Sequence, residues 1–137
     1  MKDAGAAVAF TARALSGNHE YADGDTVIFP QIITNIGGHY NSSTSKFTCP
    51  VDGTYMFAVN FLSAWEEEVM RAEIVKEGVA LVGGFVDYIE GEFNTGSAMA
   101  ITACSAQEQV LVRSSGLGKM YGGYYCHFSG FLLFPIV

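Results

Sequence analysis

Glycines divide this chain into short apolar segments, and their spacing constrains the fold more than any other feature. The 16 glycines are spread over all 137 residues and are not gathered in one region. Short apolar segments bounded by turn-forming residues are typical of all-β sandwiches and barrels. We expect nine segments to form strands: 7–13, 26–34, 46–49, 54–63, 69–76, 79–87, 97–104, 108–113 and 126–135.

In three of these segments the order of apolar and polar residues predicts how the strand is buried or whether it is a strand at all. In segment 54–63 four large apolar residues alternate with smaller or polar ones and would lie on one face of a strand: Tyr55, Phe57, Val59 and Phe61. Segment 69–76 has acidic residues before it and Lys76 at its end, which suits a helix, but Met70 and Ile74 belong to a strand-like alternation, so we predict a strand. Residues 128–134 are apolar at nearly every position, which predicts a central strand buried on both faces.

Composition excludes several classes of protein. A chain of 137 residues that is 50% hydrophobic and only 15% charged is not disordered, and its length predicts a single domain over residues 1–137. A net charge of −7 argues against nucleic acid as a partner, because phosphates require a basic surface. No apolar stretch is long enough to cross a bilayer, so we expect no membrane insertion. So few charges leave apolar surface exposed, which favours self-association.

Residues 29–57 contain a set of aromatic and small residues at fixed intervals: Phe29, Asn35, Tyr40, Phe47, Gly53, Tyr55 and Phe57. The residue types and the spacing resemble the signature of the C1q globular-head family. Val59 departs from it, because an aromatic residue is usual there, but a β-branched side chain still fills the inward face. Segments 8–12 and 128–134 resemble the opening and closing strands of the family, so the resemblance extends over the whole chain.

The resemblance implies an all-β jelly-roll sandwich of about ten antiparallel strands that assembles as a trimer, as in the C1q and tumour-necrosis-factor-like superfamily. The chain looks like the short invertebrate members without a collagen stalk, many of which are lectins. It therefore implies a secreted, non-enzymatic pattern-recognition protein of innate immunity, a homotrimer that binds microbial or self glycans. Two alternatives are a cytokine-like ligand of a protein receptor and a calcium-binding extracellular matrix protein.

The motifs of the chain agree with a protein that is not an enzyme. The three histidines are isolated from one another, and neither H-E-x-x-H nor G-x-S-x-G occurs. The aromatic residues of the signature, together with Phe131 and Leu133, are expected in the core. Asn35 lies between apolar neighbours, and we expect its amide to bond loop backbone.

The segment 114–125 is the best candidate for a ligand site, because it combines four glycines with tyrosines and a lysine. Sugars stack on aromatic rings while polar groups bind their hydroxyls. We predict a ligand site from this segment, joined by one residue of another loop: Lys119, Tyr121, Tyr124, Tyr125 and Trp65. The alternative is that these tyrosines pack against a neighbouring copy of the chain.

Charged residues suggest two further features. Asp87 and Glu92 flank Gly91 and match acidic positions that bind calcium in some members of the family, so calcium is a candidate cofactor; the alternative is solvated carboxylates. An anionic glycan would need a nearby cation, and three residues could supply it: Arg71, Arg113 and Lys119.

Disulfide formation and glycosylation both depend on the cellular compartment in which the chain folds. Cys49, Cys104 and Cys126 form no C-x-x-C motif, and three buried thiols are slightly favoured over one disulfide with one free thiol. The N-terminal residues do not form a signal peptide, which leaves two alternatives, a cytosolic protein or a secreted one whose signal is not part of this sequence. The resemblance favours the second. The sequon that begins at Asn41 is a glycosylation site if the chain is secreted.

Overall fold

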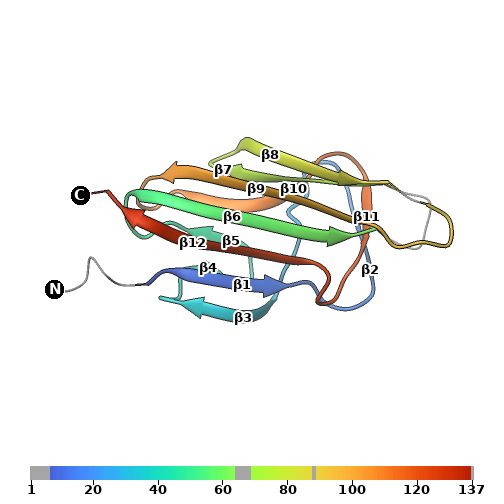
Figure 1. Ribbon diagram of the computed structural model, residues 1–137, viewed down its shortest axis with the longest axis horizontal. Coiled ribbons are helices and arrows are strands. Elements are labelled where there is room, and N and C mark those ends of the chain that lie inside the picture. Colours follow the sequence, from blue (N-terminus) through green and yellow to red (C-terminus); the bar gives the residue numbers. More distant parts are fainter. Residues whose placement is uncertain (1–6, 64–68, 88, 137) are drawn as a thin grey trace.

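The chain forms a sandwich of two antiparallel five-stranded sheets, closed at one end by a two-stranded ribbon (Figure 1). A computed structural model describes residues 7–63, 69–87 and 89–136, and these residues contain twelve strands and no helix. An all-β jelly roll is therefore confirmed.

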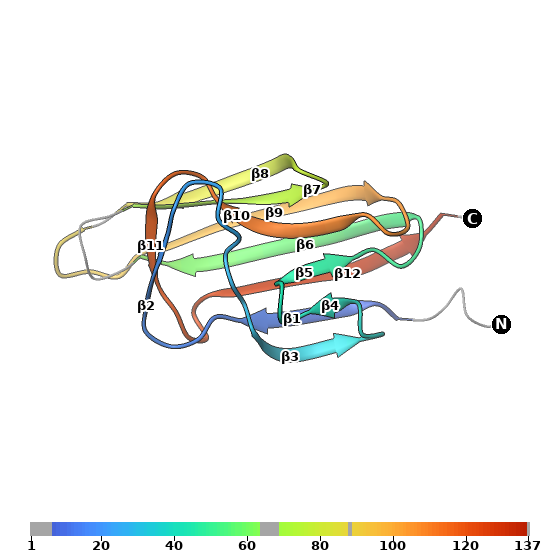
Figure 2. The same cartoon turned by 180° about the vertical axis from the view of Figure 1, so that it is seen from behind.

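The strands follow the sheets in an order that brings distant segments together. The first sheet has the order β3 (Gln31–Ile36), β1 (Ala9–Arg13), β12 (His127–Pro135), β6 (Gly53–Leu62) and β9 (Thr95–Cys104). The second has the order β4 (Tyr40–Asn41), β5 (Lys46–Thr48), β10 (Gln109–Ser114), β7 (Met70–Lys76) and β8 (Val79–Val86). The ribbon consists of β2 (Asn18–Tyr21) and β11 (Gly118–Tyr121), and Figure 2 shows both strands crossing one end of the sandwich.

The core lies between the two sheets and is rich in aromatic rings. Strand β6 supplies the alternating residues that its sequence predicts, and all four are buried. Phe128 of β12 is at the centre of the cluster: its ring centroid lies 4.9 Å from that of Phe10 and 5.9 Å from that of Phe29. The strand predicted for 69–76 is confirmed as β7, because the alternation of Met70, Ala72 and Ile74 places them in this core.

The prediction that β12 is buried on both faces is wrong. The strand is central in its sheet, between β1 and β6, but Phe131 and Leu133 point away from the second sheet and are each 38% exposed. They do not belong to the core. Part of the outer face of the first sheet is therefore apolar and is not covered by any described part of the chain.

The strand register orders this outer face in rows that change from apolar to polar. Residues that pair directly across antiparallel strands lie on the same face. One row is apolar and crosses four strands: Ala9, Phe131, Met56 and Ile101. A second row, nearer the ribbon end, is polar: Arg13, His127, Asn60 and Ser97.

The cysteines do not follow the favoured prediction of three thiols. Cys49 and Cys104 form a disulfide between the end of the β5 segment and the end of β9, whereas Cys126 is a buried free thiol. Asn35 behaves as predicted: its Nδ2 donates to the carbonyl oxygen of Tyr40 at 2.9 Å, and its Oδ1 accepts from the Tyr40 amide at 3.1 Å.

Three short strands lie outside the nine predicted segments. Strands β2 and β4 are short and mostly polar, and β11 lies within the glycine-rich segment 114–125, for which we predict no strand. Strands β2 and β11 pair with each other, from Gly118 opposite Tyr21 to Tyr121 opposite Asn18. This pairing fixes the base of the segment that carries the candidate tyrosines.

Candidate ligand-binding site

The turn after β11 and the end of β1 together form a pocket of about 390 Å³, which we call the tyrosine pocket. It lies at the end of the sandwich where β1 ends and β12 begins (Figure 1). Eight residues line it: Arg13, Ser16, Gln31, Tyr121, Gly122, Gly123, Tyr124 and Tyr125. Three of the four residues predicted from segment 114–125 are thus brought together, and a ligand site at this place is geometrically possible.

Backbone hydrogen bonds hold the tyrosine segment against the loop after β1. The Gly122 amide donates to the Gly17 carbonyl at 2.7 Å, and the Gly123 amide donates to the Leu15 carbonyl at 3.1 Å. Glycine is required at position 122, because a Cβ there would overlap the carbonyl oxygen of Leu15. The thiol of Cys126 donates to the Tyr121 carbonyl at 3.0 Å. The floor of the pocket is therefore fixed by main chain and a buried thiol.

The tyrosine rings differ in what they can offer a ligand. Tyr124 is 66% exposed and Tyr125 is 54% exposed, and their ring centroids lie 5.1 Å apart. Tyr121 is half-buried, and its ring meets the ring of Phe93 edge-on at 5.3 Å. Tyr124 and Tyr125 hence present open aromatic surface of the kind on which a sugar ring stacks, while Tyr121 supports the wall.

Arg13 lines the pocket and is a candidate residue that the sequence interpretation missed. It ends β1, and its guanidinium carbon lies 5.6 Å from the centroid of the Tyr124 ring. Gln31, the first residue of β3, adds an amide to the same pocket. The pairing of β1 with β12 brings Arg13 opposite His127, so only the order of strands in the sheet could have revealed this neighbourhood.

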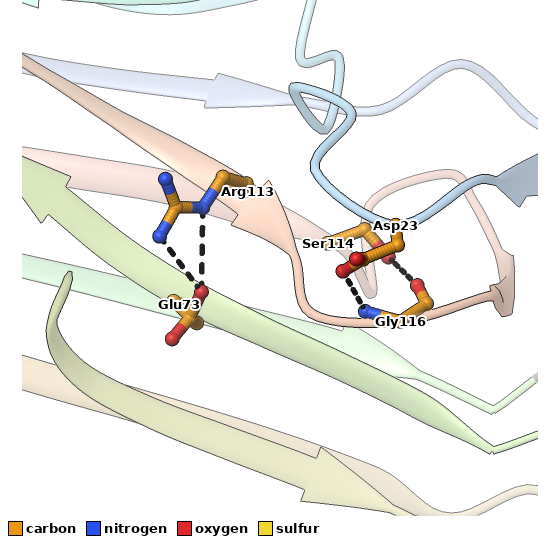
Figure 3. Close-up of polar contacts among 5 residues, drawn as sticks. All are labelled: Asp23, Glu73, Arg113, Ser114 and Gly116. Atoms are coloured by element: carbon orange, nitrogen blue, oxygen red, sulfur yellow. Dashed lines mark hydrogen bonds and ion pairs between the residues drawn. The ribbon is translucent and has the colours of Figure 1, made fainter. Parts of the chain in front are cut away.

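The three cations proposed from the sequence lie elsewhere. Arg113 is held by Glu73, with Nη2 3.2 Å from the carboxylate oxygen Oε1 (Figure 3). Lys119 of β11 lies 3.7 Å from the Glu20 carboxylate across the ribbon and is not among the residues that line the pocket. Arg71 is on β7 of the second sheet, 5.9 Å from the Phe85 ring centroid.

The segment that leads into β11 is anchored separately. The Asp23 carboxylate accepts a hydrogen bond from the Gly116 amide at 2.7 Å, and the Ser114 hydroxyl donates to the Gly116 carbonyl at 2.7 Å (Figure 3). The first bond ties the turn between β10 and β11 to the loop after β2, and the second closes the turn itself. The two-stranded ribbon is thus fixed at both of its ends.

The structure does not bring the remaining predicted residues together in a site. Trp65 lies outside the described residues. Asp87 and Glu92 are both exposed near the turn between β8 and β9, where Ile89 pairs with Glu92. Within the described ranges no three acidic, histidine or cysteine side chains come together as a metal-binding group. The described residues also contain no helix that could cross a membrane.

Comparison with known sequences gives one consistent family. The model of the C1q domain matches residues 9–133. The chain is 30% identical over 122 residues to a complement C1q subcomponent of Bos taurus, and the match covers 86% of this chain and 48% of the relative. It is 31% identical over 119 residues to another complement C1q subcomponent, from Mus musculus, covering 85% and 47%. The chain spans about half the length of the curated relatives it matches.

Solved structures show the same fold at low sequence identity. The globular domain of zebrafish complement 1qA protein has a TM-score of 0.78 and 18% identity, over 94% of this chain and 99% of that chain. Eiger TNF from S. frugiperda has a TM-score of 0.71 and 11% identity, over 96% and 94%. At these identities the likeness concerns the fold alone.

Proposed function

The chain belongs to the C1q domain family, and from this we propose that it is a secreted, non-enzymatic recognition protein of innate immunity that binds glycans as a homotrimer. The observation that carries the glycan proposal is the tyrosine pocket. It combines two open aromatic rings with amide, hydroxyl and guanidinium donors within one hollow of about 390 Å³. Pockets for small ligands have volumes of about 300–1,000 Å³ and combine apolar walls with a few polar groups.

The proposed homotrimer is supported by the apolar row on the outer face of the first sheet. Phe131, Met56 and Ile101 form a continuous band across three strands, and Met99 extends it along β9. A soluble chain rarely leaves such a band uncovered unless another copy or a partner buries it. Three copies meeting at this face would bury it around a common axis.

The trimer is tested by placing a charge in the band. Ile101→Asp should dissociate the assembly in sedimentation velocity at micromolar concentration, because three carboxylates would have to be desolvated together. Val79→Asp is the matched control: Val79 on the second sheet is 63% exposed and Ile101 is 61% exposed. A parent protein that sediments as a monomer, or two variants with the same effect, would contradict the proposal.

Glycan binding is tested on polysaccharide-coated surfaces and on an array of immobilised glycans. We expect a single site to bind with a dissociation constant of about 0.1–1 mM, so that measurable retention depends on the three sites of one trimer. Tyr124→Ala should reduce retention strongly while the trimer persists. Phe85→Ala is the control, since it removes an exposed ring from β8 of the second sheet, which does not line the pocket.

Two results would favour a different ligand site or a different function. If Tyr124→Ala dissociates the trimer, the tyrosines pack between protomers and the ligand site lies elsewhere. If the parent protein binds no glycan on the array but binds cells, and protease treatment of the cells abolishes that binding, a cytokine-like role with a protein receptor is favoured.

Calcium binding through Asp87 and Glu92 also stays a proposal, tested by calorimetric titration with calcium chloride and by the Asp87→Asn variant.

A further inference from the structure

We propose that the tyrosine pocket selects ligands that carry a carboxylate, and that Arg13 binds this group. The proposal rests on the proposed glycan binding at the same pocket, and it names the chemical class of sugar: an acidic saccharide, such as a uronic acid, in preference to its neutral counterpart.

The first observation is that Arg13 has no carboxylate partner among the described residues. Across the described part of the chain, the guanidinium makes an aromatic contact with Tyr124 but no ion pair. Arg113, by contrast, already binds Glu73. Arginine placed on an aromatic face keeps its N–H groups in the plane of the guanidinium, and these are the groups that bind a carboxylate in a bidentate manner.

The second observation is the composition of the pocket wall. The described residues that line it include no acidic side chain, although the whole chain has 14 Asp and Glu against 7 Lys and Arg. Beside Arg13 the wall offers the Gln31 amide, the Ser16 hydroxyl and the tyrosine hydroxyls. A local excess of donors in a protein of net charge −7 favours an anion at this position over a cation.

The third observation concerns the arrangement of ring and charge. Tyr124 and Tyr125 lie side by side with centroids 5.1 Å apart, and Arg13 lies over the first of them. A sugar ring stacked on the open tyrosine surface would therefore have a substituent within reach of the guanidinium. A neutral hydroxymethyl group there gains one ordinary hydrogen bond, whereas a carboxylate gains a charge-assisted pair.

The experiment compares matched sugars that differ by one carboxylate. The probes are glucuronate with glucose, galacturonate with galactose, and N-acetylmuramate with N-acetylglucosamine, each as a bead-coupled glycoside and as a free competitor. The parent protein should bind the acidic member of at least one pair about tenfold more tightly. Arg13→Gln should reduce this ratio to about twofold or less, because it weakens the binding of the acidic member much more than that of the neutral member.

The control variant is Arg71→Gln. It removes the same charge from a guanidinium that also lies over an aromatic ring, Phe85, but on the second sheet. It should keep the full preference for the acidic sugar. This result would show that the preference depends on the local contact with Arg13 and not on the net charge of the protein. Raising the salt concentration should weaken the binding of acidic but not of neutral sugars.

Each outcome decides something. Equal binding of both members of every pair, or a preference that survives Arg13→Gln, overturns the inference while Tyr124-dependent binding of neutral sugars keeps the proposed function. No binding of any sugar overturns both. If Arg13→Gln does not fold, NMR of the Arg13 side-chain Nε–H in the parent protein decides: a shift with glucuronate but not with glucose supports the inference, and no shift with either contradicts it.

Discussion

Two phenylalanines on one strand give the sharpest test of how this sheet is built. Phe128 and Phe131 are three positions apart on β12 but point to opposite faces: Phe128 is 0% exposed and Phe131 is 38% exposed. Besides Phe10 and Phe29, the Phe128 ring has Tyr40 at 6.2 Å and Phe57 at 6.4 Å between centroids. Truncating either residue to alanine removes the same atoms. Any difference between the two losses in free energy of unfolding therefore comes from the surroundings of the ring.

We expect Phe128→Ala to lower the free energy of unfolding by about 3–5 kcal/mol, because the surrounding rings cannot close the cavity. That is a large part of the total of about 5–15 kcal/mol for a domain. Phe131→Ala should lower the unfolding free energy of the protomer by only about 1–2 kcal/mol, since part of the ring is exposed already and no closed cavity forms. Its main effect should fall on association.

The assay is urea unfolding followed by tyrosine fluorescence over a hundredfold range of protein concentration, together with sedimentation. Phe128→Ala should shift the midpoint downward at every concentration. The effect of Phe131→Ala should grow with concentration, in step with loss of the trimer. If Phe131→Ala is the more destabilising variant at the lowest concentration, or Phe128→Ala leaves the midpoint unchanged, the assignment of the two faces is refuted. Phe128→Leu, a milder change, serves if the alanine variant is insoluble.

The remaining predictions concern titration, disulfide chemistry and modification. Burial lowers the pKa of His127, so the folded state resists its protonation; stability should be full above pH 6.5 and fall as the pH drops below it, and His127→Gln should flatten that decline in the melting temperature. Reduction of the Cys49–Cys104 disulfide, whose residues are 55 apart in sequence, should cost about 2–4 kcal/mol of unfolding free energy in a denaturant titration. Burial raises the pKa of the Cys126 thiol to about 11, so iodoacetamide at pH 8 should modify it only after denaturation, as mass spectrometry would show. Asn41 is exposed on the edge strand β4, and secretion from eukaryotic cells should add a glycan mass that Asn41→Gln removes.

Local patterns predicted the fold where strands are long and one face is buried. The alternation in β6 identified both the strand and its inward face, because a period of two is visible in ten residues. The same reasoning failed for β2 and β11, which are four residues long and pair along their length with each other. It also failed for the outer face of β12, because an apolar sequence does not say whether its cover comes from the same chain or from another copy.

The candidate site was predicted only in part, for a related reason. The tyrosines are close in sequence, so composition alone drew attention to them. Arg13 reaches Tyr124 through the pairing of the first and last strands, a contact between opposite ends of the chain. Lys119 is close to the tyrosines in sequence, yet the pairing of β11 with β2 directs it to Glu20. The tyrosines could be predicted because they are close together in the sequence. Arg13 could not, because it reaches the pocket only through the pairing of distant strands.

The pairing of β1 with β12 also sets how this domain can be attached to anything else. Strand β1 begins where β12 ends, with Ala9 opposite Phe131, while the tyrosine pocket lies where β1 ends and β12 begins (Figure 1). A linker joined to either end of the sandwich therefore leaves from the side away from the pocket. Tethered to a bead, a sensor chip or a longer polypeptide, the domain would stand with its pocket outward, so immobilisation through either terminus suits the binding assays described above.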